Sequence, residues 1–182
     1  MLFSLLLPIL VSQSPDAAQF MPKGPRIEFT MASRKSFVIT TDAKGSPKTV
    51  AHIIALVRKG FYDKQRVHRV ESWVTQWGAP ASRDQAFEIQ SKDGKMVPNP
   101  AVGDGGSGKD IAFEESLVDY HRGVVGIAST GLQVGGDSQL FILKKDTLRL
   151  FRSYAVVGKV TQGMATVDGI RRGDRIMKAK VL

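Results

Sequence analysis

One stretch of the sequence carries most of a phosphate-binding motif. Gly103, Gly108 and Lys109 occupy the positions of G-x-x-x-x-G-K, in which backbone N–H groups and a lysine bind phosphates. The next residue is Asp110, where the motif requires a hydroxyl for Mg²⁺, and both Asp104 and Asp110 would repel phosphate. No clear buried strand precedes this stretch, and no convincing helix follows it. We therefore interpret it as a glycine-rich surface loop and not as a nucleotide site.

The histidines and serines give little support to metal or nucleophile chemistry. The chain has no cysteine, and its histidines, His52, His68 and His121, are too far apart for a zinc-ligand pattern. Neither Ser107 nor Ser138 lies in the G-x-S-x-G turn of serine hydrolases. We therefore expect no metal ion and no cofactor.

Arg69 is the cationic side chain that matters most for a possible site. It lies in a strand predicted over residues 66–70, where successive side chains point to opposite faces. If Arg69 faces a groove, its neighbour His68 faces inward and is expected to be a hydrogen-bonded core residue. An isolated arginine in a β-strand is ordinarily an outward-facing surface residue. The motifs around Arg69 change that interpretation.

Several short segments resemble the cyclophilin-type peptidyl-prolyl cis–trans isomerases in their order and spacing. They are Tyr62-Asp63, Val67-His68-Arg69-Val70, Gln76-Trp77-Gly78, Ser138-Gln139-Leu140-Phe141-Ile142 and Tyr154-Ala155-Val156-Val157-Gly158-Lys159-Val160. The resemblance extends from about Ser36 to Leu182. It implies catalysed rotation of X-Pro bonds in proline-containing polypeptides, in support of protein folding. The alternative is a non-catalytic peptide-binding or chaperone module on the same fold, which would not need to keep a groove arginine.

The resemblance also assigns roles to individual residues. Arg69 is the catalytic residue, and Gln76 holds the substrate backbone. Phe141 forms the floor of the proline pocket, while Ala128 and Ser129 meet the substrate through their backbone. The remaining substrate-binding positions are Trp73, Val74, Leu150 and Tyr154.

The sequence departs from the family pattern at four places, one of which is Trp77-Gly78-Ala79 in place of the common Gly-Gly-Asp. The stretch between Val70 and Gln76 is one residue shorter than usual, so Trp73 is assigned by counting back from Gln76. Arg149 replaces a tryptophan found in many ciclosporin-binding members, which argues against tight binding of that drug. Residues 83–100 form a longer polar excursion than the family pattern predicts, and we expect a loop beside the groove.

The hydrophobic pattern predicts a mainly β fold. A helix is expected to begin at Ser46-Pro47, with Ser46 as its cap, and to bury the stripe Val50, Ile53, Ile54 and Val57. A second helix is expected over 164–171. Many strands without a βαβ rhythm indicate an all-β barrel, and the resemblance implies a closed eight-stranded antiparallel β-barrel capped by two α-helices. Strands are expected at 36–41, 66–70, 73–77, 123–129, 139–143, 154–160 and 175–181, with Met177, Ala179 and Val181 facing inward in the last.

The N-terminal segment predicts export. Residues 1–11 read MLFSLLLPILV, a run shorter than the roughly 20 apolar residues that span a bilayer but typical of a signal peptide. Small residues follow, and cleavage is expected after Ser14 or Ala18. We therefore predict a signal peptide over 1–18, a linker over 19–35 and the isomerase domain over 36–182, in a periplasmic or extracellular protein. The alternatives are an apolar anchor at a membrane surface and a simple apolar extension.

The 182-residue chain is strongly basic, with a formal net charge of +9. Such a charge is compatible with nucleic acid, anionic membranes or acidic clients. The lysines and arginines are scattered, and their densest cluster lies on the predicted turn and strand over 171–180. We interpret them as a solvated basic surface and expect a monomer with no nucleic-acid partner and no stable membrane span.

Overall fold

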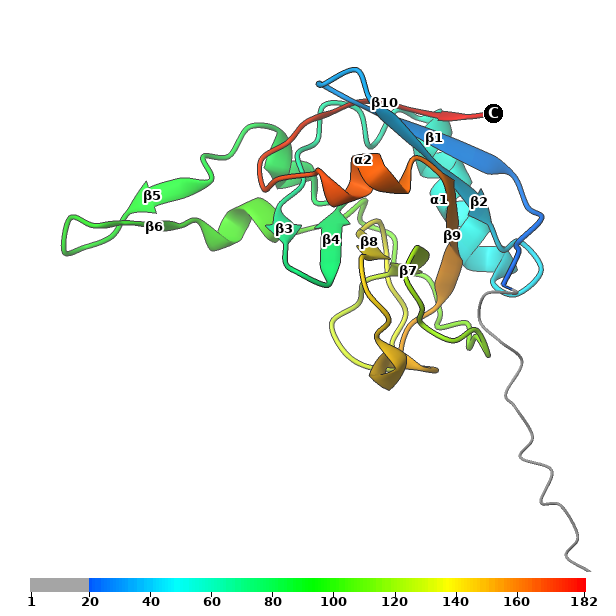
Figure 1. Ribbon diagram of the computed structural model, residues 1–182. Coiled ribbons are helices and arrows are strands. Elements are labelled where there is room, and N and C mark those ends of the chain that lie inside the picture. The colour runs from blue at the N-terminus through cyan, green and yellow to red at the C-terminus, as the bar shows by residue number, and fades with distance from the viewer. Residues whose placement is uncertain (1–19) are drawn as a thin grey trace, which may run out of the picture.

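The computed structural model describes residues 20–182, so the predicted signal peptide lies outside the described residues. An eight-stranded antiparallel sheet curls around a central core, with the strand order β10-β1-β2-β9-β7-β8-β4-β3 (Figure 1). Within residues 20–182, no helix is both long enough and apolar enough to cross a membrane. The strands of this sheet are Arg26–Met31 (β1), Ser36–Thr41 (β2), Arg69–Val70 (β3), Val74–Trp77 (β4), Val124–Ile127 (β7), Leu140–Leu143 (β8), Val156–Gln162 (β9) and Ile176–Val181 (β10).

The two end strands of the sheet, β3 and β10, are not joined by a continuous ladder. The only bridge at this seam pairs Arg66 with Arg175, among the described residues. Backbone hydrogen bonds beside it join residues 64–67 to residues 173–176, including Val67 N–H to the Asp174 carbonyl at 2.9 Å. The barrel is therefore curled and nearly shut, and the expected full closure is overstated.

Strand β1 corrects the expected domain boundary. The linker expectation includes residues 26–31, yet β1 pairs with both β10 and β2 as the second strand of the sheet order. Its sequence alternates polar and apolar residues, and Ile27 and Phe29 are completely buried. This alternation was the available signal for a strand. The folded domain therefore begins at or before Arg26.

Helix α1 (Pro47–Arg58) buries the predicted stripe in the core inside the sheet, which confirms that prediction. Its capping differs from the expectation, because the Ser46 side chain forms no cap hydrogen bond. Instead, the Glu114 carboxylate accepts the N–H groups of Lys48 and Thr49 at 3.0 and 2.7 Å. A carboxylate at a helix N-terminus also complements the helix dipole, so a distant loop residue caps this helix. The second helix, α2, is shorter than expected and covers Met164–Asp168.

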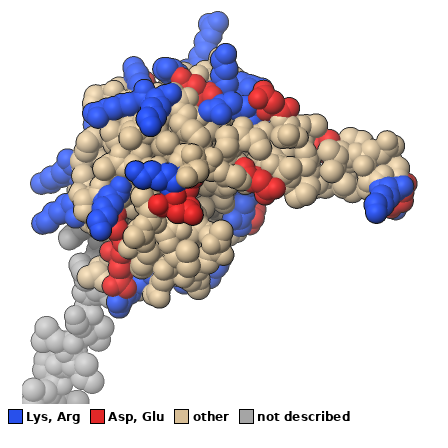
Figure 2. Space-filling view, turned by 180° about the vertical axis from the view of Figure 1, so that it is seen from behind, with Lys and Arg blue, Asp and Glu red and all other residues tan. Residues whose placement is uncertain are grey.

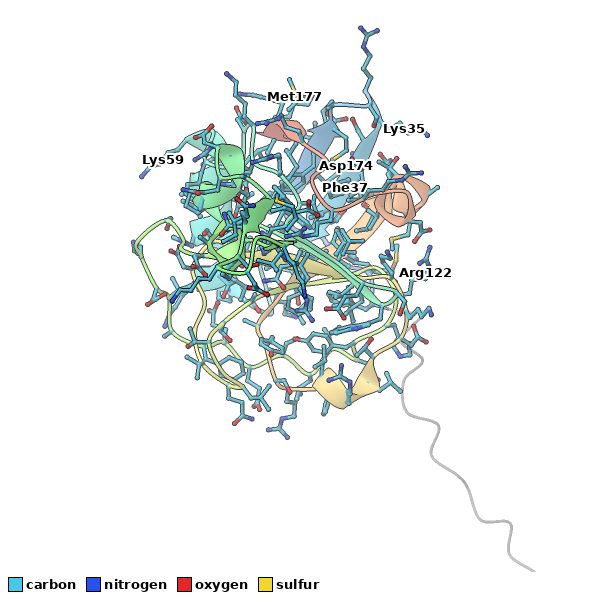
Figure 3. The ribbon with its side chains drawn as sticks, turned by 90° about the vertical axis from the view of Figure 1, so that its left-hand side faces the viewer. Lys35, Phe37, Lys59, Arg122, Asp174 and Met177 are labelled. Atoms are coloured by element: carbon cyan, nitrogen blue, oxygen red, sulfur yellow. The ribbon has the colours of Figure 1, made fainter. Side chains whose placement is uncertain are left out.

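A β-bulge changes which residues of β10 face the core. The register between β1 and β10 shifts between Thr30 and Met31, so that Met177 has no partner in β1. Met177 is 46% exposed, and Figure 3 shows it at the outer surface while Phe37 lies inside. The expectation that Met177 faces inward is therefore wrong, because an inserted residue interrupts strand alternation.

The two faces of the sheet carry separate apolar clusters. In β4, Trp77 packs into the large inner core, while Val74 belongs to a second cluster on the outer face. In β8, Leu140 and Ile142 pack into the inner core, while Phe141 belongs to the outer cluster. This arrangement follows the two-residue period of strand side chains. One set of strands thus supports both the interior and an external apolar surface.

Residues 83–100 form an arm and not the expected loop beside the groove. The hairpin of β5 (Glu88–Gln90) and β6 (Met96–Pro98) extends far from the body in Figures 1 and 2. At its base, the Phe87 ring lies 4.4 Å from the guanidinium carbon of Arg66 and 4.8 Å from that of Arg172. These cation–π contacts attach the arm to the body of the molecule.

The basic residues are distributed over the surface with acidic residues among them (Figure 2). In the C-terminal cluster, Lys178 pairs with Asp63 at 2.7 Å and Lys180 pairs with Glu28 at 3.0 Å. This pattern agrees with the interpretation of a solvated basic surface.

Candidate functional site

A row of paired residues crosses four strands on the outer face of the sheet. Arg69 of β3 is paired with Gln76 of β4, Gln76 with Phe141 of β8, and Phe141 with Gly126 of β7. Directly paired residues project from the same face, with Cβ atoms about 4.5–5.5 Å apart. The strand register therefore brings a guanidinium, an amide and an aromatic ring together from distant parts of the chain.

This row opens on a groove with a cavity of about 300 Å³. The structure brings together in this groove every residue that the sequence analysis assigned to a site. Arg149, which the resemblance marks only as a departure from the family pattern, also lines it. The predicted residues are Arg69, Trp73, Val74, Gln76, Ala128, Ser129, Phe141, Leu150 and Tyr154.

The floor of the groove is the ring of Phe141, which lies against Gly126. A Cβ atom at Gly126 would collide with this ring, so glycine is needed for the close approach. The Tyr154 ring meets Phe141 edge-on at 5.5 Å, and the Tyr120 ring stacks on it at 6.3 Å between centroids. The Tyr120 hydroxyl donates to the Tyr154 carbonyl at 2.6 Å. Burial raises the pKa of Tyr120, so its hydroxyl remains a neutral donor.

Two hydrogen bonds fix the Arg69 guanidinium at the edge of the groove. Its Nε donates to Glu71 Oε1 at 2.7 Å, and its Nη1 donates to Gln76 Oε1 at 3.2 Å. The other carboxylate oxygen of Glu71 accepts the indole N–H of Trp73 at 2.7 Å. The bond from Arg69 lowers the pKa of Glu71, which keeps the carboxylate charged at neutral pH. One carboxylate thus holds both the arginine and one wall of the groove.

A chain of amide hydrogen bonds continues from Arg69 to the glycine-rich loop. Gln76 Nε2 donates to Gln139 Oε1 at 2.9 Å, and Gln139 Nε2 donates to the carbonyls of Gly103 and Gly105 at 2.8 and 3.0 Å. This loop lines a second recess of about 690 Å³, which shares Gln76 and residues 128–129 with the groove. The two depressions therefore form one continuous surface.

Comparison with known proteins identifies this architecture. Residues 26–182 match the family model described as cyclophilin type peptidyl-prolyl cis-trans isomerase/CLD. The chain belongs to this family. A probable peptidyl-prolyl cis-trans isomerase of Brucella abortus is 34% identical over 151 residues, covering 75% of this chain and 72% of that protein. The chain is thus a cyclophilin-type peptidyl-prolyl cis–trans isomerase, as the resemblance implied.

One further protein is similar to this chain in sequence, and another is similar mainly in structure. A putative thylakoid lumen peptidyl-prolyl cis-trans isomerase of Synechocystis is 28% identical over 176 residues, covering 86% of this chain and 46% of that protein. The crystal structure of a Cryptosporidium parvum cyclophilin has a TM-score of 0.67 at 17% identity, covering 87% of this chain and 97% of that one. This structural match supports the cyclophilin fold.

Glu71 is the main contact of the cyclophilin groove that the sequence analysis did not assign. It precedes Trp73 by two residues and follows Arg69 by two, so its carboxylate lies between their side chains. The available signal was the tryptophan itself, because an indole N–H in a groove requires an acceptor. Gln139 is a second contact that the resemblance leaves without a role, although it follows Ser138 in one of the family-like segments.

His68 lies outside the core, contrary to expectation. It is half-buried, its ring lies close to Gly103, and its buried Nδ1 has no hydrogen-bond partner among the described residues. Burial and the nearby charges of Arg69 and Arg172 lower the pKa of His68 to about 4. His68 is therefore neutral at neutral pH. It does not line the groove.

His52 contacts a carboxylate on the loop side of the molecule. Its Nε2 lies 3.1 Å from Asp137 Oδ1, and Asp137 also accepts the Ser107 hydroxyl and the Gly108 N–H. These bonds lower the pKa of Asp137 against the opposing effect of its burial. Asp137 thus attaches the glycine-rich loop to the body, and no helix follows that loop. Within residues 20–182, no group of three or more potential metal ligands occurs.

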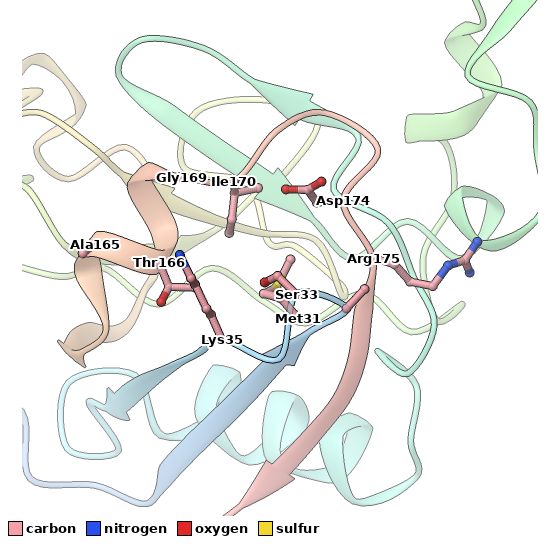
Figure 4. Close-up of a pocket in the computed structure, with 10 residues that line it drawn as sticks. Met31, Ser33, Lys35, Ala165, Thr166, Gly169, Ile170, Asp174 and Arg175 are labelled. Carbon is pink, nitrogen blue, oxygen red and sulfur yellow. The ribbon is translucent and has the colours of Figure 1, made fainter.

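A third recess, of about 160 Å³, lies between the β1–β2 turn, α2 and the segment before β10 (Figure 4). None of the predicted site residues lines it. Its only carboxylate, Asp174, accepts the N–H of Arg171 at 2.8 Å. We assign no chemistry to this recess.

Proposed function

We propose that the groove binds an X-Pro segment of a polypeptide and that Arg69 accelerates rotation about the X-Pro bond. The observation that carries this proposal is the placement of a fixed guanidinium at the edge of an aromatic-floored pocket. The family to which the chain belongs indicates the reaction, and the groove contains the residues that we propose for it.

The barrier to this reaction comes from amide resonance. Resonance opposes rotation by about 18–20 kcal/mol, and uncatalysed X-Pro isomerisation takes tens to hundreds of seconds. At the twisted transition state, resonance is lost and the prolyl nitrogen regains a lone pair. A donor directed at this nitrogen stabilises the twisted state more than the planar ground state. Only such differential stabilisation accelerates the reaction.

Arg69 is arranged to provide this donor. Its bonds to Glu71 and Gln76 use Nε and Nη1, while Nη2 has no partner within residues 20–182. The two bonds restrict rotation of the guanidinium before substrate binds, which reduces the reorganisation needed in the transition state. Arg69 and Glu71 side chains are each 44% exposed, so a peptide reaches them without displacing buried groups.

The remaining groove residues hold one side of the X-Pro bond while the other turns. Phe141, Leu150 and Trp73 provide apolar surface for the pyrrolidine ring, and Gln76 provides amide groups for the peptide backbone. The backbone at Ala128 and Ser129 borders both the groove and the second recess, where an extended peptide would continue.

A proline-isomerisation assay tests this function. We expect residues 19–182 to accelerate cis–trans exchange of an Ala-Pro peptide without added metal or nucleotide. Activity that disappears with a chelator and returns with a metal ion would overturn the proposal. Absence of acceleration by the folded protein would overturn it as well.

We also propose that the protein is exported, with cleavage after Ser14 or Ala18. The support is the apolar segment 1–11 with the small residues that follow it, and the relative described as a putative thylakoid lumen protein. Mass spectrometry of the native protein should find an N-terminus at Pro15 or Gln19. Intact Met1 in a cytoplasmic fraction would contradict export.

A further inference from the structure

The groove carries a positive charge that no residue of the described chain neutralises. Two cations, Arg69 and Arg149, and no acidic residue line it. The charge of Arg69 is paired with Glu71 at 2.7 Å. Arg149 forms no salt bridge and no side-chain hydrogen bond within residues 20–182. The nearest acid in sequence, Asp146, is engaged with His121 at 2.9 Å.

Arg149 is an exposed residue whose side chain lies against one wall of the groove. It lies in a short 3-10 turn, Leu148–Leu150, where the Leu150 N–H donates to the Thr147 carbonyl at 3.0 Å. Its neighbour Leu150 is a buried wall of the groove. The Arg149 guanidinium carbon lies 5.1 Å from the centre of the Trp73 ring, within the range of a cation–π contact. The charge is therefore placed beside the surface that receives the proline ring.

We propose that Arg149 determines substrate specificity and that the groove prefers X-Pro segments with a carboxylate side chain one or two residues from the proline. This inference rests on the proposed function of the groove. An extended residue spans about 3.3–3.6 Å, so a glutamate or aspartate flanking the proline can reach a cation on the pocket wall. A guanidinium binds a carboxylate through two parallel N–H groups, which an exposed lysine cannot reproduce.

Because Arg149 is exposed, we expect only a modest preference for substrates with a carboxylate. Ion pairs at exposed positions are weak, and their measured strength corresponds to about two- to five-fold in an equilibrium or specificity constant. Salt screens such pairs, so the preference should decrease as ionic strength rises. A peptide with lysine at the same position should be the poorest substrate.

The test uses peptides that differ only in a Glu, Gln or Lys placed one or two residues before or after the proline. The specificity constant (kcat/KM) and the affinity (Kd) are measured for each peptide with the folded protein. We expect Glu to exceed Gln by about two- to five-fold at one of these positions. The Arg149→Gln variant should lose this Glu-to-Gln ratio. Lys145→Gln removes the same charge from an exposed residue that does not line the groove, and it should keep the ratio.

The outcomes separate this inference from the proposed function. If the Gln peptide is turned over and the Glu peptide is no better, the role of Arg149 is overturned while the proposed function stands. The same holds if Arg149→Gln keeps the Glu-to-Gln ratio of the wild type. If Lys145→Gln loses the Glu-to-Gln ratio as much as Arg149→Gln does, the role of Arg149 is also overturned, because the ratio would then depend on net charge. Absence of turnover with every peptide overturns the proposed function, and this inference falls with it.

Discussion

The two tryptophans of this chain lie four residues apart and have opposite surroundings. Trp77, in β4, is completely buried and meets the rings of Phe29 and Phe37 edge-on at 5.2 and 5.8 Å. Its indole N–H has no hydrogen-bond partner within residues 20–182. Trp73 is only partly buried, donates its N–H to Glu71, and lies near the guanidinium groups of Arg69 and Arg149. The inner tryptophan contributes packing, and the outer one contributes polar contacts to a groove.

Strand alternation alone does not explain this difference. Residues 73 and 77 have the same parity and would face the same side of a regular strand. Trp73 lies outside β4, in a turn where the Glu71 N–H donates to the Val74 carbonyl at 2.9 Å. This turn places Trp73 on the outer face, in the groove. We therefore expect stability to depend mainly on the inner face, and we propose that peptide binding and catalysis depend on the groove of the outer face.

The largest expected effect on stability comes from the inner tryptophan. Trp77→Ala should lower the free energy of unfolding by about 3–5 kcal/mol, because it leaves a cavity beside Phe29 and Phe37. Trp73→Ala should change stability much less and should weaken peptide binding. Urea denaturation and peptide titration of both variants check this contrast. Equal loss of stability in the two variants would contradict the division between the faces.

A smaller effect is expected from His68, the neighbour of Arg69 that does not line the groove. Its pKa is lowered to about 4 in the folded protein, against about 6.5 in an unfolded chain. Between these pH values the unfolded chain binds a proton that the folded chain does not, so stability should fall as pH decreases from 6.5 to 4. Because His68 is only half-buried, we expect it to contribute about 1–2 kcal/mol of this fall.

Denaturation of His68→Gln at pH 7 and at pH 4.5 measures this contribution. The variant should lose less stability than the wild type between the two pH values. Its isomerase activity at pH 7 should be affected far less than that of an Arg69 variant, because His68 does not line the groove. An unchanged pH dependence would show that His68 is not the group responsible.

The smallest effect is expected from Glu71, which contacts both Arg69 and Trp73. Glu71→Ala removes an acceptor from each of them and should lower kcat by about two- to ten-fold, the size of one net hydrogen bond. Glu71→Gln should recover part of the loss because its amide oxygen can still accept a bond. Glu115→Ala breaks a comparable surface pair with Arg152, neither of which lines the groove, and should leave kcat unchanged. A similar fall in kcat in Glu115→Ala would contradict a positioning role for Glu71.

The residues assigned to the site lie together in one groove because the contributing strands keep regular register. Arg69, Gln76 and Phe141 were recognised through motifs, and direct pairing in the ladders then brings them together. Helix α1 was predictable for a similar reason, since its buried stripe has a clear helical period. Local patterns were therefore sufficient where the structure is locally regular.

The errors arise where a distant or inserted residue decides the structure. Met177 faces outward because a bulge against β1 interrupts the alternation, and a single strand does not show its partner's register. Ser46 does not cap α1 because Glu114, far along the chain, takes that position. The linker expected over residues 26–31 is wrong although β1 alternates visibly, because the motifs that carry the resemblance begin only at Ser36.

The central claim is that Arg69 lowers the rotational barrier and contributes little to ground-state binding. Its most direct test compares kcat with Kd for the same Ala-Pro peptide in wild type and in folded Arg69→Ala. We predict a fall in kcat of about 10²–10³-fold, as for loss of one transition-state donor, with a much smaller change in Kd. Arg69→Lys should also be poor, since a point ammonium does not reproduce the planar guanidinium. A folded Arg69→Ala protein that retains kcat, or that loses affinity alone, would contradict the account.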